Sequence, residues 1–180
     1  VAATHLSNEF GMTYRYLEKK GFKIDQKIEM TMSTDTPEGL SKSMGMGLMS
    51  FGQLFSNCRP DILMVLGDRY EMLSAVAAAM PFVIPIAHLH GGEATEGLID
   101  EPIRHSITKM SHLHFVATQE YYDRVVQLGE EPWRVNLSGA PSLDSLHNIK
   151  YWSKKTLENK IKLSLDKKTL LVTLHPVTLE

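Results

Sequence analysis

The chain has 180 residues, of which 43% are hydrophobic and 22% are charged, so it can form a globular domain and is too apolar to be disordered. Its net charge is 19 − 21 = −2, which provides no basic field for nucleic acid or an anionic membrane. A single cysteine, Cys58, excludes a disulfide framework and a four-cysteine zinc site, and it favours a reducing compartment. We therefore expect a cytoplasmic globular protein that binds neither nucleic acid nor a membrane.

Short apolar runs alternate with segments of helical composition along the chain. Residues 61–66 form an almost continuous apolar run between Pro60 and Gly67, as in strands that are buried on both faces of a parallel sheet. The next segment, 70–80, is rich in Ala, Met and Leu, which favour a helix. In chain order, the pattern predicts strands over 1–4, 61–66, 82–87, 114–117, 135–137 and 170–175, and helices over 70–80, 102–111 and 118–128.

This alternation of strands and helices indicates an α/β fold. Right-handed βαβ units at this spacing build a doubly wound, mostly parallel sheet of the Rossmann-like kind. The polar, lysine-rich stretch after residue 145 is typical of a linker and a helix that lead into a second domain. The predicted strands at both ends lack the neighbour and crossover that a parallel strand needs, so we expect the chain to be part of something longer.

Two candidate residues lie at the carboxyl ends of predicted strands, and ligands of such sheets bind beyond these ends. Asp68, in the sequence GDRYE at 67–71, is expected where a strand ends and a helix begins. It is either a helix cap or an acid placed for chemistry. His175 precedes a proline at the end of the final predicted strand, and is therefore expected at a carboxyl edge as well.

The sequence HLHGGE at 88–93 follows the next predicted strand. Residues i and i+2 of a strand share a face, so His88 and His90 are expected to point into one space. Gly91 and Gly92 would let the backbone approach a ligand closely. Hydrogen-bonded histidines at a strand end and a substrate site both fit this pattern. A metal site also fits it, with His88, His90, Glu93 and Asp100 as the ligands.

A pair of adjacent acids opens the predicted helix over 102–111. Asp100 and Glu101 precede a proline, where a helix cap is expected. Arg104 and His105 follow one turn later, so Arg104 could form an ordinary ion pair with either acid. Acids at a helix start near histidines could equally be tuned for proton transfer.

Five stretches together carry a family resemblance: HLS at 5–7, FGMTY at 10–14, GDRYE at 67–71, HLHGGEATEGLIDEPIRHSITKMSHLHF at 88–115 and HPVT at 175–178. They resemble the hydrolysing UDP-N-acetylglucosamine 2-epimerases of sialic acid and related nonulosonic acid synthesis. The block at 88–115 is the most specific of the five, and the match runs over nearly the whole chain.

The resemblance implies the GT-B arrangement, in which two Rossmann-like domains face each other across a cleft. It implies that residues 1–145 are the N-terminal, catalytic-side domain without its first strand. Residues 146–180 are then a linker, a helix and the first strand of the nucleotide-binding C-terminal domain. Relatives of this kind are commonly dimers or tetramers, so the resemblance also implies a homo-oligomer.

The implied reaction converts UDP-N-acetylglucosamine to N-acetylmannosamine and UDP. A proton leaves C2, UDP leaves C1 in an anti elimination, and water adds to the resulting 2-acetamidoglycal. Carboxylates and a histidine move these protons, with no metal or redox cofactor. The implied catalytic residues are Asp68, Asp100 and His175. Many relatives have a glutamate at the position of His90, so the resemblance implies that either His90 or Glu93 takes the acid–base role of that glutamate. The expected substrate-binding residues are Arg69, His88, Gly91, Gly92, Glu101, Arg104 and His105.

Four alternatives stay open at this point. The first is a hydrolysing 2-epimerase for a nucleotide-linked diacetamido trideoxy sugar, as used in legionaminic-type acid synthesis. The second is a GT-B glycosyltransferase. The third is a metal-dependent hydrolase built on His88 and His90. The fourth is a non-catalytic module that binds a nucleotide sugar.

Overall fold

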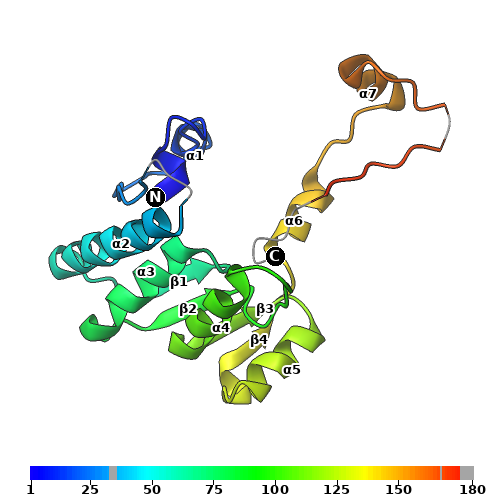
Figure 1. Cartoon of the computed structure of the whole chain (residues 1–180). Helices are drawn as coiled ribbons and strands as arrows, with labels where there is room; N and C mark the ends of the chain where they lie inside the picture. The colour runs from blue at the N-terminus through cyan, green and yellow to red at the C-terminus, as the bar shows by residue number, and fades with distance from the viewer. Residues whose placement is uncertain (33–35, 167, 175–180) are drawn as a thin grey trace.

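The centre of the molecule is a four-stranded parallel sheet (Figure 1). The computed structural model describes residues 1–32, 36–166 and 168–174, with the side chains of residues 147 and 148 left out. Its strands are β1 (Leu63–Leu66), β2 (Ile86–Leu89), β3 (Leu113–Val116) and β4 (Val135–Leu137), in the order β1-β2-β3-β4. All neighbouring pairs are parallel. The predicted mostly parallel, Rossmann-like α/β fold is confirmed.

Three helices connect consecutive strands: α3 (Tyr70–Ala79), α4 (Asp100–Met110) and α5 (Gln119–Gln127). Because such crossovers are right-handed and the strand order follows the chain, the three helices lie on one face of the sheet. The strand residues that are buried on this covered face are Val65, Ile86, His88, His114, Val116 and Val135. On the opposite face, the open face, Met64 and Leu66 of β1 are 62% and 57% exposed.

Helix α2 (Pro37–Asn57) packs against α3 and is the longest helix of the described residues (Figure 1). The Thr36 hydroxyl caps it by accepting a hydrogen bond from the N–H of Gly39 at 3.1 Å. At Gly47 a Cβ atom would meet the terminal methyl of Met30 and would lie 3.0 Å from Ser74 of α3, so α2 and α3 approach each other closely at this glycine. The helix is absent from the predicted elements because its four glycines lower its helix propensity. Nowhere in the described ranges does a helix combine the length and apolarity needed to cross a bilayer.

The strand predicted over 1–4 is wrong. A 3₁₀ helix, η1 (Ala3–Leu6), occupies this segment, and Ala3 has a left-handed φ of 50°. In the described part of the chain, the segment makes a single parallel bridge, from Ala2 to Ile28, and one bridge does not sustain a strand. Helix α1 (Tyr14–Lys19) follows before α2.

The strand predicted over 82–87 begins four residues late, at Ile86. Pro81 lies in a 3₁₀ turn, η2 (Met80–Phe82), and Val83 has a left-handed φ of 53°. Pro85 has no N–H to donate to a ladder, so the two prolines displace the start of the strand. The elements predicted over 61–66, 70–80, 102–111, 114–117, 118–128 and 135–137 are confirmed within two residues at each end.

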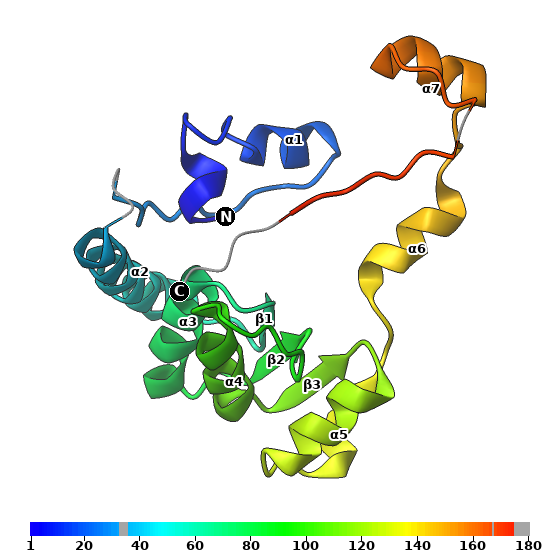
Figure 2. The ribbon, with the colours of Figure 1, turned by 45° about the vertical axis from the view of Figure 1, so that its right-hand side comes forward.

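After the 3₁₀ turn η3 (Pro132–Arg134) and β4, the chain leaves the sheet (Figures 1 and 2). Helices α6 (Pro141–Asn148) and α7 (Lys154–Ile161) extend away from it, and α7 buries none of its residues. The strand predicted over 170–175 is wrong for its described part, since 170–174 form no strand and Leu171 is 96% exposed. No described strand lies beside this segment to pair with it. The predicted domain boundary after residue 145 falls inside α6 and stays a prediction.

Candidate active site

The turn after β1 places Asp68 at the carboxyl edge of the sheet. Gly67 has a φ of 83°, a left-handed value that favours glycine. Its N–H donates to the carbonyl of Leu89 at 3.0 Å, and its carbonyl accepts a hydrogen bond from Nε2 of His88 at 2.8 Å. The turn is therefore fixed to β2. The interpretation of Asp68 as a helix cap is wrong, because Arg69 occupies the N-cap position of α3 and no side chain caps that helix.

Arg104 of α4 lies at the centre of the site, with its side chain only 3% exposed. Nε donates to Oδ2 of Asp68 at 2.9 Å, and Nη2 donates to the same oxygen and to the hydroxyl of Thr95. Nη1 donates to the carbonyl of Glu93 at 2.8 Å and to Oε2 of Glu101 at 3.0 Å. A guanidinium has five N–H groups, and all five are used here. Arg104 thus holds together the turn after β1, the loop after β2 and the start of α4.

Glu101 joins the same network from the first turn of α4. Its carboxylate accepts hydrogen bonds from the N–H of Thr95 and from Nη1 of Arg104, and it contacts Nε2 of His105 at 3.2 Å. Burial alone would raise the pKa of Glu101. The hydrogen bonds from Thr95 and His105 and the charge of Arg104 outweigh burial and hold that pKa below its ordinary value. Glu101 therefore stays ionised and anchors Arg104.

Asp100, beside Glu101, has the opposite electrostatic environment. Burial, followed by the negative charge of nearby Asp68, raises the pKa of Asp100 above its ordinary value, although Arg69 and Arg104 oppose this shift. A carboxyl group with a raised pKa is a better proton acceptor and donor near neutral pH. Two adjacent acids, Asp100 and Glu101, thus differ in the direction of their pKa shifts, as expected when one of them is available for proton transfer.

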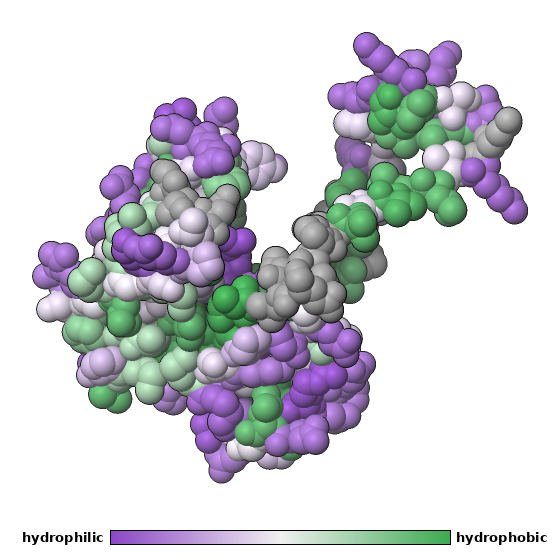
Figure 3. Space-filling model, viewed as in Figure 1, coloured by the Kyte–Doolittle hydropathy of each residue, from purple (hydrophilic) through white to green (hydrophobic). Residues whose placement is uncertain are grey.

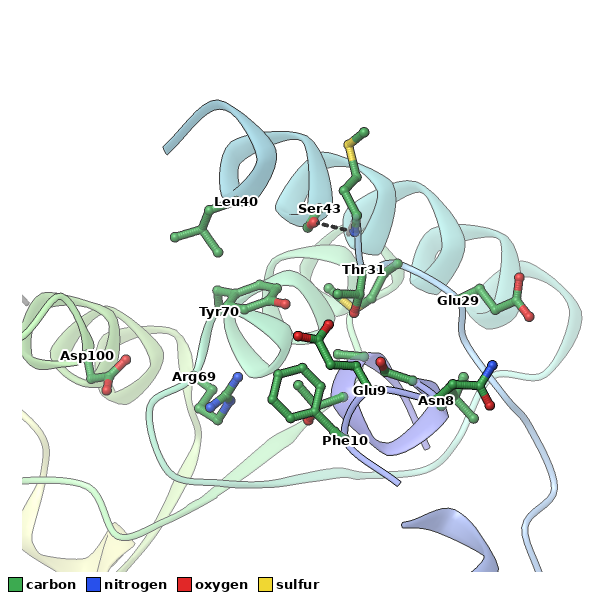
Figure 4. Close-up of a pocket in the computed structure, with 16 residues that line it drawn as sticks. Asn8, Glu9, Phe10, Glu29, Thr31, Leu40, Ser43, Arg69, Tyr70 and Asp100 are labelled. Carbon is green, nitrogen blue, oxygen red and sulfur yellow. Dashed lines mark hydrogen bonds between the residues drawn. The ribbon is translucent and has the colours of Figure 1, made fainter. Parts of the chain in front are cut away.

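A cavity of about 820 Å³ adjoins the carboxyl edge of the sheet, a size that suits a small-molecule ligand (Figure 4). Arg69, Tyr70 and Asp100 line it from the sheet side, and the N-terminal segment contributes Glu9 and Phe10 from the other side. Nε of Arg69 donates to both carboxylate oxygens of the buried Glu71, at 3.1 and 3.2 Å. This ion pair holds the Arg69 side chain at the wall of the cavity.

His88 is a fully buried part of the frame around the site. Its Nε2 donates to the Gly67 carbonyl, and its Nδ1 lies 3.2 Å from the Thr108 hydroxyl, so both ring nitrogens are used. Burial is the main cause that lowers the pKa of His88 to about 4. His88 is therefore neutral at physiological pH and points away from the cavity, against α4.

His90 does not share a face with His88, contrary to the expectation from strand alternation. Strand β2 ends at Leu89, and His90 has a left-handed φ of 64° that turns its side chain out of the strand register. Its Nδ1 lies 2.6 Å from Oε1 of Glu93, and both side chains are partly exposed. His90 and Glu93 thus form a pair. The sequence left open which of the two carries a proton, and the structure shows that the two groups are in direct contact.

Gly91 and Gly92 pack against protein. A Cβ at Gly91 would lie 3.1 Å from both the His88 ring and the Thr108 hydroxyl. Gly92 has a φ of 80°, and a Cβ there would collide with the carbonyl of Tyr121 in α5. These contacts give a local structural reason for both glycines, and their predicted contact with substrate stays a prediction.

The donor geometry disfavours the metal site proposed for His88, His90, Glu93 and Asp100. Both nitrogens of His88 are already bound within the protein, and His90 faces Glu93. Over the described ranges, no group of three or more His, Cys, Asp or Glu side chains has the geometry to hold a metal ion. His175, the remaining predicted catalytic residue, lies outside the described residues.

The structure thus gathers most of the predicted site residues at one edge of the sheet. Asp68, Glu93, Glu101 and Arg104 form one hydrogen-bonded network, while Arg69 and Asp100 face the cavity. The sequence interpretation missed Thr95, which bonds both Arg104 and Glu101, and Tyr70, which lines the cavity. Both residues lie within stretches that carry the family resemblance, Tyr70 in GDRYE and Thr95 in the block at 88–115, so the resemblance was a usable signal for each.

A parallel sheet with acids, a buried arginine and a cavity at its carboxyl edge defines a Rossmann-like domain with a site for a small polar ligand. The family model described as UDP-N-acetylglucosamine 2-epimerase matches residues 1–180, and the chain belongs to this family. The resemblance inferred from the sequence is confirmed.

Two curated relatives are similar over almost the whole chain. A Campylobacter jejuni protein named GDP/UDP-N,N'-diacetylbacillosamine 2-epimerase (hydrolyzing) is 46% identical, over 97% of this chain and 45% of its own length. An Escherichia coli protein named polysialic acid biosynthesis protein P7 is 42% identical, over 99% of this chain and 46% of its own length. The chain therefore spans about half the length of the curated relatives it matches.

The solved structure of UDP-GlcNAc 2-epimerase from Neisseria meningitidis bound to UDP-GlcNAc has a similar fold. Its TM-score to this chain is 0.71 at 21% identity, and the match covers 84% of this chain and 42% of that structure. At this identity the similarity supports the fold alone.

Proposed function

We propose that this chain is the catalytic-side domain of a hydrolysing 2-epimerase that acts on a nucleotide-linked 2-acetamido sugar. One observation carries the proposal: Asp100 lines the cavity, and burial and the charge of Asp68 raise its pKa. An epimerase that works through elimination needs such a group, because the proton at C2 of the sugar is weakly acidic and its acceptor must be unprotonated yet basic.

The proposed chemistry has two stages. Asp100 accepts the proton from C2 while the C1–O bond breaks and UDP leaves with the bonding electrons. Positive charge that develops at C1 is stabilised by the carboxylate of Asp68, which Arg104 holds in place. Water then adds to the double bond of the 2-acetamidoglycal, with hydroxide going to C1 and a proton to the opposite face of C2. The product is the free 2-epimer.

The remaining predicted residues divide into two groups in this proposal. Arg69 and His105 stay candidates for contact with substrate, and the His90–Glu93 pair and His175 stay candidates for the second proton transfer. Among the other predicted substrate-binding residues, His88, Glu101 and Arg104 act by positioning the site, since their polar groups are engaged within the protein. Gly91 and Gly92 stay candidates for a close approach of the backbone to substrate.

The sugar is either N-acetylglucosamine or a diacetamido trideoxy sugar. The relative that is 46% identical is named for N,N'-diacetylbacillosamine, and this similarity favours the diacetamido sugar as a second candidate that fits at least as well as UDP-N-acetylglucosamine. Both sugars carry the 2-acetamido group and the nucleotide that the chemistry above requires. In either case the product would enter synthesis of a sialic acid or a related nonulosonic acid.

The complete enzyme that contains this domain provides the test. In heavy water, with each UDP-sugar in turn and no acceptor, we expect release of UDP and a free sugar that carries deuterium at C2. The preferred sugar is the one with the larger kcat/KM. A requirement for an acceptor would instead identify a glycosyltransferase. A product without deuterium at C2 would contradict epimerisation through elimination, and loss of turnover on chelation would favour the metal-dependent hydrolase.

Two further statements belong to this proposal. We place the reaction in the cytoplasm, since the chain has one cysteine, exposed and free, as is usual in a reducing compartment. We also propose that the enzyme is a homo-oligomer, with neither nucleic acid nor membrane as a partner, which its net charge of −2 supports.

A further inference from the structure

Thr95, in the loop between β2 and α4, has a hydroxyl hydrogen that the protein leaves without an acceptor. The N–H of Thr95 donates to Oε2 of Glu101, and its hydroxyl oxygen accepts a hydrogen bond from Nη2 of Arg104 at 2.9 Å. Over the described ranges, however, no group accepts a hydrogen bond from the hydroxyl hydrogen itself. Thr95 is partly exposed, so this donor is open to a ligand.

Hydrogen bonds to two arginines hold this loop in place. Nη1 of Arg104 donates to the carbonyl of Glu93 at 2.8 Å, two residues before Thr95. On the other side, Arg124 of α5 donates to the carbonyl of Gly92, and Figure 3 shows mostly hydrophilic surface over α5. Because Arg104 is itself buried and fully bonded, it fixes the Thr95 hydroxyl in one position before any ligand binds.

The Thr95 hydroxyl lies beside the carboxylate that the proposed chemistry places at C1 of the sugar. Nη2 of Arg104 donates both to this hydroxyl and to Oδ2 of Asp68. Two acceptors of one nitrogen lie within about 6 Å of each other, since each hydrogen bond spans about 3 Å. The oxygen that leaves is bonded to C1, so a sugar whose C1 meets Asp68 brings that oxygen within reach of Thr95.

The hydrogen bond from Arg104 makes this hydroxyl a stronger donor than an ordinary one. A hydroxyl that accepts from a cation is polarised, and successive hydrogen bonds in such a chain strengthen one another. A fixed, polarised donor best matches an oxygen that becomes more negative during the reaction. In the proposed chemistry, that oxygen is the one between C1 and the β-phosphorus of UDP. The acetamido carbonyl, another acceptor near C1, gains no comparable charge.

We propose that Thr95 is a catalytic residue of the elimination stage, whose hydroxyl, oriented by Arg104, donates a hydrogen bond to the phosphate oxygen that leaves C1. The C1–O bond breaks, its electron pair goes to the leaving oxygen, and the proton stays on Thr95, so UDP departs as an anion. This inference rests on the proposed function and adds to it a donor for the leaving group. Hydration of the 2-acetamidoglycal breaks no bond to phosphate, so Thr95 has no part in that second stage.

The complete enzyme tests this role when the two stages are measured apart. The first is the release of UDP from the preferred UDP-sugar, and the second is the hydration of 2-acetamidoglycal supplied together with UDP. Thr95→Val keeps the shape of threonine without the hydroxyl, and it should slow UDP release by about 10²–10³-fold, the usual effect of losing one donor to developing negative charge. Hydration should stay within about threefold of the parent rate, and Thr95→Ser, which keeps the donor, should restore most of the UDP release.

The ratio of the two rates separates donation to the leaving group from mere support of the site. Thr95→Val also removes an acceptor from Arg104, which holds Asp68, and a loosened Asp68 would slow both stages because positive charge develops at C1 in each. Ser106→Ala is the matched control. The exposed hydroxyl of Ser106 lies on the same helix as Arg104 and donates to the Pro102 carbonyl of that helix, so both rates should equal those of the parent.

Three results would overturn the role of Thr95: equal slowing of both stages in Thr95→Val, parent-like UDP release in that variant, or failure of Thr95→Ser to restore release. A parent enzyme that releases no UDP from either sugar would overturn the proposed function, and the role of Thr95 with it. The two failures are therefore distinguishable, because the first three are seen only when the parent enzyme is active.

Discussion

Asp100 and its neighbour Glu101 have pKa values shifted in opposite directions. Asp100 stands next to Glu101 on the same helix turn, but Glu101 is fixed by hydrogen bonds and Arg104, whereas Asp100 faces the cavity and is affected by burial and Asp68. This contrast supports the proton-transfer role proposed for Asp100, because the group that moves a proton should not be held in one ionisation state.

Asp100→Asn in the complete enzyme should therefore lower kcat by about 10²–10⁴-fold with little change in protein stability. Asp68→Asn should lower kcat over a similar range of about 10²–10⁴-fold, but it also weakens the contact with Arg104 and should lower the unfolding temperature as well. Steady-state kinetics and thermal unfolding of both variants separate the two roles. Turnover near the parent value in Asp100→Asn would remove it from the mechanism.

His88 allows a prediction about pH at the scale of one residue. Its pKa falls from 6.5 in the unfolded chain to about 4 in the fold, so between these values the unfolded state binds a proton that the folded state does not. The unfolding free energy should thus fall as pH is lowered through this window, by about 3 kcal/mol from His88 alone. Burial lowers the pKa of His114 as well, although Glu130 opposes the shift, and His114 adds to the same trend.

Urea unfolding at a series of pH values from 8 downward measures this dependence. In His88→Gln, which keeps a side-chain N–H donor for the Gly67 carbonyl, the slope of stability against pH should be shallower by up to about 1.4 kcal/mol per pH unit. Identical slopes in parent and variant would show that His88 titrates normally.

At the scale of elements, the packing of α5 against the loop after β2 depends on Gly92. Its φ of 80° is matched by the φ of 78° at Gly139, but a Cβ collides with the Tyr121 carbonyl at Gly92 and meets nothing at Gly139. Both alanine variants should be strained by the left-handed backbone, and Gly92→Ala should be less stable than Gly139→Ala by a further 1–3 kcal/mol or so. Chemical unfolding of the pair isolates the cost of the close contact. Equal loss in both would mean that α5 shifts freely.

The elements between 61 and 137 could be predicted because each carries a local signal: apolar runs for the strands, Ala-rich or capped segments for the helices, and glycines after them. Other elements depend on partners distant in the chain. Helix α2 is rich in glycine and is stable because it packs on α3. Residues 1–4 include Val1 and Thr4, which favour a strand, but the segment makes only one bridge among the described residues. Propensity alone does not reveal either outcome.

The candidate site shows the same limit. The sequence showed that Asp68 follows a strand and that Asp100 lies at the start of a helix. It also allowed the prediction that both residues lie at the carboxyl edge of the sheet. The ion pair of Arg104 with Glu101 was one of those expected, but the full role of Arg104 could not be seen. Its other acceptors, Asp68, Thr95 and the carbonyl of Glu93, lie in turns separate from α4, and a backbone carbonyl leaves no trace in a sequence. The face that His90 presents was predicted wrongly because a single left-handed residue breaks the alternation of a strand.

At the scale of the whole molecule, the sheet and its helices bury a core, whereas the segment after α6 is exposed. Helix α7 buries none of its residues, and Leu170 to Leu174 lie extended and exposed. Removal of residues 150–180 should therefore leave the thermal unfolding midpoint of the sheet region unchanged within about 2 °C, a shift that corresponds to about 0.5–1 kcal/mol. Calorimetry of the shortened and parent chains tests this. A clearly lower midpoint would show that the segment stabilises the sheet region.

The open face of the sheet has a practical consequence for work with the isolated chain. With Met64 and Leu66 exposed on one side of an otherwise ordered sheet, dyes such as anilinonaphthalene sulfonate should bind and fluoresce strongly. Such fluorescence is commonly taken as a mark of a molten globule, which also loses its near-ultraviolet circular dichroism. Here the two signals should not change together: dye fluorescence should be strong while the near-ultraviolet circular dichroism of the packed aromatic side chains is kept. A preparation judged by dye fluorescence alone would therefore be discarded as misfolded although it is native.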